Sequence, residues 1–244
     1  MNLGRDVPIL LAAVAAIIGA SLDGDGRWLH WIAKPLATLL IAAMAFRSAD
    51  RWSATDTPSA HHTYARAILL GMAFSCIGDI ALMLPFDAFV PGLIAFLLAH
   101  VCYIVAFRAG FRAGRGLGAA GALLAVFAGI NLAGLWPLLP NDLRIPVVVY
   151  VAVLALMATL ALARAWSRTS TAEPALQGAR WAAIGAVLFV VSDSVLAWDR
   201  FGGGLPAASL CVLATYYAAQ YCIARSVSPD RSQLDSSRSS LVLR

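Results

Sequence analysis

The sequence contains little charge and almost no lysine. Only 13% of its 244 residues are charged, 61% are hydrophobic, and Lys34 is the single lysine. This composition excludes an ordinary water-soluble domain and predicts a chain whose solvent is mostly lipid. The four cysteines show no paired spacing, which argues against a disulfide framework or a zinc knuckle. No basic patch is interleaved with aromatic residues, so we expect no nucleic-acid partner.

Uncharged stretches of membrane-spanning length recur along the chain. A helix needs roughly 20 apolar residues to cross a bilayer, and these runs are too long and continuous for barrel strands. We therefore expect an all-α polytopic membrane protein with eight transmembrane helices. The expected spans are 7–22, 28–46, 64–84, 89–108, 117–136, 145–166, 180–198 and 206–225. The first also fits a signal peptide, although "IGASLDGDG" is a poor cleavage region.

The arginines are distributed unevenly between alternate loops. With a cytoplasmic N-terminus, the inner segments hold 14 arginines and the outer loops only 3. The outer three are Arg27, Arg144 and Arg200. This bias predicts a multi-pass protein of the cell (inner) membrane with both termini in the cytoplasm. We expect residues 1–226 to form one catalytic transmembrane domain and the Ser-rich tail 227–244 to be disordered.

Three ionisable residues lie within the expected spans, although a charge inside the hydrocarbon costs several kcal/mol unless it is paired, hydrated or neutral. They are Lys34, Asp79 and Asp193. At about 1.5 Å per residue, each lies roughly 8 to 9 Å from the outer end of its helix. We therefore expect the three side chains to share one depth in the outer half of the membrane.

Helical spacing places further polar residues near these three. Small residues share a stripe with each aspartate, where they would let a neighbouring helix approach closely. The stripe on the third span is Gly71, Ser75, Gly78, Asp79 and Leu82, and that on the seventh is Gly185, Phe189, Ser192, Asp193 and Leu196. His100 and Tyr103 share one side of the fourth span with Gly92, Phe96 and Phe107. Tyr217 and Gln220 share a face of the eighth span, and Asn131 offers an amide from the fifth.

An offset of 114 residues relates the two aspartates. It superposes Arg66 on Arg180, Gly71 on Gly185, Asp79 on Asp193, Leu82 on Leu196 and Tyr103 on Tyr217. The echo suggests a duplication of four helices, although Ala and Leu dominate both halves and chance also explains a few matches. An even number of helices would keep the halves parallel and bring the carboxyls face to face.

Four motifs resemble the YhhN-type lysoplasmalogenase family of integral membrane proteins. They are "KPLATLL" at 34–40, "GMAFSCIGDIALML" at 71–84, "GLIAFLLAHVCYIVAF" at 92–107 and "GAVLFVVSDSVLAW" at 185–198. The resemblance covers about residues 28–225. It implies eight helices, a lysophospholipid substrate in a membrane, and hydrolysis of the vinyl ether bond of lysoplasmalogens to a fatty aldehyde and a glycerophospho-base. The matching motif residues are Lys34, Asp79, His100, Tyr103, Ser192 and Asp193.

This chemistry needs an acid, a base and a dry pocket, and no cofactor or metal. Protonation of the vinyl ether β-carbon gives an oxocarbenium ion, which water captures to give a hemiacetal. Two carboxyls close together in a medium of low dielectric cannot both ionise easily, so we expect one to keep its proton. We assign Asp193 as the acid and Asp79 as the base. Lys34 would hold the base ionised or bind the substrate phosphate, and His100 and Tyr103 would hydrogen-bond the carboxyls or the glycerol.

Other interpretations of the same residues stay open. Lys34 with either aspartate also fits a structural ion pair, and His100 fits a hydrogen-bonded core histidine. A proton-coupled transporter would also place ionisable groups in the bilayer, although we find no broken-helix pattern of Gly and Pro. An intramembrane aspartyl protease shares the paired aspartates and the Gly78-Asp79 step. A zinc amidohydrolase would need about three histidines at the metal, and only His100 lies clearly inside.

Overall fold

The computed structural model describes residues 3–22, 26–53, 59–111, 114–166 and 173–227. Residues 228–244 of the predicted tail therefore lie outside the described residues. Eight α-helices account for most of the described chain: α1 (Leu3–Ala20), α2 (Arg27–Ser53), α3 (Ser59–Met83), α4 (Phe89–Arg108), α5 (Arg115–Leu135), α6 (Arg144–Trp166), α7 (Glu173–Phe201) and α8 (Ala208–Arg225). The 3-10 turn η2 (Trp136–Leu138) follows α5, and the described segments contain no strand. The prediction of an all-α protein is confirmed.

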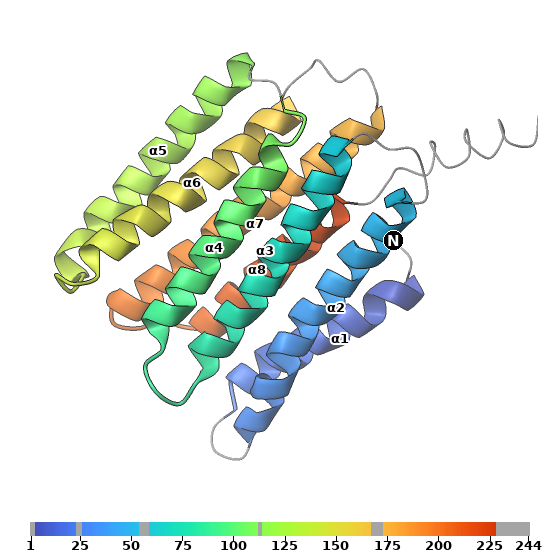
Figure 1. The fold of residues 1–244 in the computed structure, drawn as a ribbon. Helices are drawn as coiled ribbons and strands as arrows, with labels where there is room; N and C mark the ends of the chain where they lie inside the picture. Colours follow the sequence, from blue (N-terminus) through green and yellow to red (C-terminus); the bar gives the residue numbers. More distant parts are fainter. Residues whose placement is uncertain (1–2, 23–25, 54–58, 112–113, 167–172, 228–244) are drawn as a thin grey trace, which may run out of the picture.

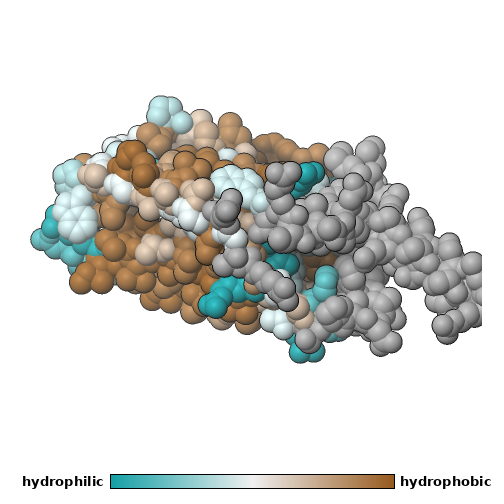
Figure 2. Space-filling model, turned by 90° about the horizontal axis from the view of Figure 1, so that it is seen from above, coloured by the Kyte–Doolittle hydropathy of each residue, from teal (hydrophilic) through white to brown (hydrophobic). Residues whose placement is uncertain are grey.

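Six of these helices are long and apolar enough to cross a membrane, namely α2 to α7. The chain is a multi-pass membrane protein. Eight spans stay a prediction, since α1 contributes only a shorter apolar helix and α8 is not among the six. The orientation of the termini also stays a prediction. Figure 2 shows a broad hydrophobic surface over the middle of the face in view, with hydrophilic residues gathered toward the ends. Large apolar side chains such as Ile130 and Ile145 are exposed on the surface of the bundle, where a membrane protein meets lipid rather than water.

The helices run roughly parallel and antiparallel in one bundle (Figure 1). Helix α3 packs closely on α4, α7 on α8, and α5 on α6, while α1 and α2 form an outer pair. Gly71 makes the α3–α4 contact possible, because a Cβ there would lie 2.4 Å from the Tyr103 ring. Gly185 does the same for α7 and α8, where a Cβ would lie 2.8 Å from the Ala219 carbonyl oxygen. Both glycines belong to the small-residue stripes, so close helix approach explains their place beside the aspartates.

Several helices continue past the expected spans. Helix α2 reaches Ser53 and α7 begins at Glu173, seven residues beyond each predicted boundary. The sequence at both ends is polar, so hydropathy does not mark the helix there although its backbone hydrogen bonds continue. Arg27, Arg144 and Arg200 all lie at one end of the bundle, where α2 and α6 begin and α7 ends.

Candidate active site

A polar cavity lies at the end of the bundle where α2 begins and α3 and α7 end. Its volume is about 1430 Å³ when the open space at its mouth is included. Asp79 on α3 and Asp193 on α7 both line it, together with Lys34 on α2 and Ser192 on α7. Two carboxyl groups that lie 114 residues apart in the sequence therefore face one space.

Asp79 is buried and receives three favourable contacts. Its Oδ1 lies 3.5 Å from Lys34 Nζ, which makes a buried ion pair. Its Oδ2 accepts hydrogen bonds from Thr38 Oγ1 and from the Tyr216 hydroxyl, each at 2.7 Å. Thr38 lies one helical turn after Lys34, so α2 presents both donors on one face. A cation and two hydroxyl donors all stabilise a carboxylate at this position.

The hydrogen bonds continue from Asp79 into the bundle. Gln220 Nε2 donates to the Tyr216 hydroxyl at 3.3 Å, and the Tyr103 hydroxyl donates to Gln220 Oε1 at 2.8 Å. Ser75 Oγ lies 3.5 Å from the same Tyr103 hydroxyl. Tyr103 and Gln220 therefore lie behind Asp79, where they hold Tyr216 in place, and neither lines the cavity itself.

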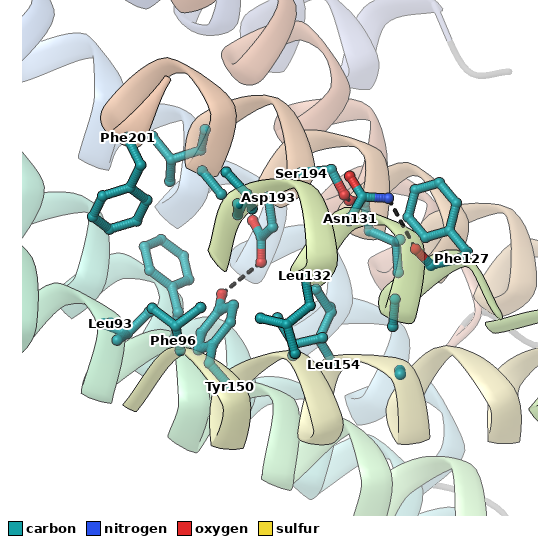
Figure 3. A pocket seen from close by; sticks show the side chains of 18 of the residues that line it. Leu93, Phe96, Phe127, Asn131, Leu132, Tyr150, Leu154, Asp193, Ser194 and Phe201 are labelled. Carbon is teal, nitrogen blue, oxygen red and sulfur yellow. Dashed lines mark hydrogen bonds between the residues drawn. The ribbon is translucent and has the colours of Figure 1, made fainter. Parts of the chain in front are cut away.

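Asp193 has different surroundings. Its Oδ2 accepts a 2.5 Å hydrogen bond from the Tyr150 hydroxyl on α6 (Figure 3). His100 Nε2 lies 3.9 Å from the same oxygen, and neither ring nitrogen of this fully buried histidine makes a hydrogen bond within the described chain. The His100 ring packs edge-on against Tyr150 and Phe189. Among the described residues, no lysine or arginine forms an ion pair with Asp193.

The remaining predicted site residues, Ser192, Asn131 and Tyr217, make no hydrogen bond to either carboxyl group in the described chain. Ser192 Oγ donates to the Val212 carbonyl oxygen at 3.0 Å and so joins α7 to α8 at the cavity wall. Asn131 accepts from Trp198 Nε1 at 3.0 Å and lines a separate apolar pocket. Tyr217 lines neither space, and its buried hydroxyl has no hydrogen-bond partner in the described part of the chain.

Sequence reasoning missed the three hydroxyl donors, Thr38, Tyr150 and Tyr216. Hydroxyl groups cost far less than charges inside a membrane span, so they do not stand out in a search for ionisable groups. The available signals were spacing: Thr38 is four residues after Lys34, and Tyr216 is four residues before Gln220. Within the described segments no three His, Cys, Asp or Glu side chains are grouped to hold a metal ion.

Comparison with known proteins finds relatives that are named lysoplasmalogenases. The chain is 34% identical over 185 residues to "Lysoplasmalogenase TMEM86A" of Bos taurus, covering 72% of this chain and 71% of that relative. It is 38% identical over 161 residues to "Lysoplasmalogenase TMEM86B" of Homo sapiens, covering 66% and 62%. It is 37% identical over 164 residues to a "Lysoplasmalogenase" of Mycobacterium tuberculosis, covering 65% and 59%.

No solved structure matches the chain. The YhhN family matches residues 29–227, which include α2 except its first two residues, every helix from α3 to α8, and both aspartates of the cavity. The protein therefore belongs to the YhhN family.

Proposed function

We propose that this enzyme hydrolyses the vinyl ether bond of lysoplasmalogens and releases a fatty aldehyde and glycerophosphoethanolamine or glycerophosphocholine. The relatives' names support the substrate class. The single observation that carries the mechanism is that Asp79 and Asp193 line one cavity with different partners. A single carboxyl group would have to both deliver and remove protons, whereas in a pair one carboxyl acts as the acid and the other as the base.

Asp193 is the acid in this mechanism. It lacks a cationic partner, so a neutral carboxyl group is the less costly form at its site within the membrane. Its proton passes to the β-carbon of the vinyl ether and leaves an oxocarbenium ion. The carboxylate that forms then lies beside this cation and stabilises it. Tyr150 fixes the orientation of Asp193 through the 2.5 Å hydrogen bond and so acts as a positioning residue.

Asp79 is the base, held ionised by Lys34, Thr38 and Tyr216. It removes a proton from the water that attacks the oxocarbenium carbon, which gives a hemiacetal. In the collapse, Asp79 returns this proton to the ether oxygen, and Asp193 accepts the proton of the hemiacetal hydroxyl. The aldehyde and the glycerol hydroxyl leave, and both carboxyls regain their starting forms.

The polar cavity suits the headgroup of the substrate. Arg27 and His30 line it near the start of α2, and Arg27 is exposed at the membrane end of the helix. A phosphate there would meet the Arg27 guanidinium, which leaves Lys34 to its ion pair with Asp79. This arrangement assigns Arg27 to the phosphate and Lys34 to the base.

One comparison of substrates tests the proposal. Purified protein in detergent is incubated with a lysoplasmalogen and with its acyl lysophospholipid counterpart, and aldehyde and free fatty acid are measured. We expect aldehyde from the first and no fatty acid from the second. Turnover in detergent also separates an enzyme from a proton-coupled transporter, which would need a gradient across a membrane. Fatty acid from the acyl lipid, or no product from either, would contradict the proposal.

A further inference from the structure

A second, apolar pocket lies beside the polar cavity. It is lined by α4, α5, α6 and α7, with one residue from α3, and its volume is about 870 Å³ when the open space at its mouth is included (Figure 3). Four polar side chains reach it, and two of these are occupied elsewhere: Asn131 bonds Trp198 and the Phe127 carbonyl, and Ser194 donates to the Val190 carbonyl. Among the described residues that line this pocket, the remaining polar pair is therefore Tyr150 and Asp193.

The two spaces meet at Asp193. Leu82, Phe96, Asp193 and Leu196 line both of them. One space is polar and holds Arg27 and Lys34, whereas the other is walled almost entirely by aliphatic and aromatic side chains. A molecule with a charged head and one apolar chain matches this pair of spaces, with its head-to-chain junction at Asp193.

The apolar pocket also reaches the surface that faces lipid. Phe127 of α5 lines the pocket and is nevertheless 40% exposed. Along α6, the lining runs from Val147 to Ala155, which is about 12 Å of helix. This length is comparable to one leaflet of a hydrocarbon core of about 30 Å. A chain that lies in the pocket can therefore extend past α5 into the leaflet from which it came.

We infer that this pocket is the binding site for the single hydrocarbon chain of the substrate, which enters from lipid past α5 and brings its vinyl ether to Asp193. The inference rests on the proposed function and adds the route and the residues that select the chain. Ala128 on α5 and Ala155 on α6 are small side chains of the pocket wall, as are Ala197 and Ser194 on α7, and together they leave the space that the chain fills. A bulky residue in place of Ala128 or Ala155 would occupy it.

Substitutions on two helices test this site, each with a matched control. Ala128→Trp and Ala155→Trp fill the pocket, whereas Ala125→Trp and Ala152→Trp add the same ring to exposed positions on the same helices. The readout is the ratio of kcat/KM for a long-chain lysoplasmalogen to that for a short-chain one. We expect the pocket variants to lower this ratio by about tenfold or more, because contacts to several methylene groups are lost, and the controls to leave it unchanged. An unchanged ratio in both pocket variants would overturn the inference.

A binding measurement keeps the inference testable if the tryptophan variants do not fold. A lysophospholipid with a saturated ether chain, which this chemistry cannot cleave, carries a photoreactive diazirine on that chain and is crosslinked to the wild-type protein. We expect labelled peptides from α5 and α6, within residues 115–135 and 144–166. Labelling confined to α1 and α2 would overturn the chain site. Because no turnover is needed, this result is independent of aldehyde release, whose absence would instead refute the proposed function.

Discussion

The two carboxyl groups of the cavity differ in what surrounds them. Asp79 has a lysine at 3.5 Å and two hydroxyl donors at 2.7 Å, whereas Asp193 has one phenol donor and an imidazole at 3.9 Å that makes no hydrogen bond in the described chain. The first environment stabilises a negative charge, and the second offers it little compensation. In the mechanism proposed above, this difference keeps the two aspartates in opposite protonation states within one membrane bundle.

Removing either carboxyl should have the largest effect. Asp193→Asn and Asp79→Asn keep side-chain volume and remove the acid or the base, so we expect each to lower kcat for aldehyde release by about 10³-fold or more. Both variants should still insert and elute as folded protein, as judged by size exclusion in detergent. Near-normal turnover by either one would rule out the division of work between the two aspartates.

Removing the lysine should impair the base, Asp79, and leave the acid, Asp193, unaffected. Lys34→Met leaves Asp79 without its cation, and we expect kcat to fall by about 10²-fold. Thermal unfolding should also show destabilisation, by less than the about 3–5 kcal/mol of a fully enclosed pair, because Lys34 borders the open cavity.

Two further measurements assign the role of Lys34. The double variant Lys34→Met/Asp79→Asn removes both charges and should regain most of the lost stability but no activity. A rise in KM with kcat unchanged in Lys34→Met would instead show that the lysine binds the substrate phosphate.

Loss of one hydroxyl should have the smallest effect. Tyr150→Phe removes the only hydrogen bond to Asp193 in the described chain and should lower kcat by about tenfold with little change in KM, because the acid loses its orientation. Tyr64→Phe is the matched control: its hydroxyl bonds Ser226 Oγ at 2.6 Å near the opposite end of the bundle. Equal rates for the two variants would remove Tyr150 from the mechanism.

The sequence was sufficient to predict the helices because the central part of each one is a long apolar segment. The predicted span 89–108 coincides with α4, and the buried face of α4 is the predicted one, with Phe96, His100, Tyr103 and Phe107. Boundaries were wrong where the helix ends are polar, as at Ser53 of α2, because hydropathy carries no signal there.

Only the charged residues of the candidate site could be predicted from the sequence. A charge within an apolar span is conspicuous, so Lys34, Asp79 and Asp193 could be identified from the sequence. Their hydrogen-bond partners were not identified, because the sequence does not show which of two buried tyrosines reaches a carboxyl group. Tyr216 and Tyr217 are neighbours in sequence but point about 100° apart around α8, and it is Tyr216 that reaches Asp79. Only the packing of α8 against α2 and α7 decides between them.

Infrared spectroscopy of the purified protein at neutral pH tests the central claim most directly, because the C=O stretch of a protonated carboxyl group is distinct from that of a carboxylate. The paired-aspartate mechanism predicts a protonated-carboxyl band that is present in the wild-type protein and in Asp79→Asn but absent from Asp193→Asn. A band that disappears with Asp79→Asn and survives Asp193→Asn, or no such band in the wild-type protein, would contradict the assignment of acid and base.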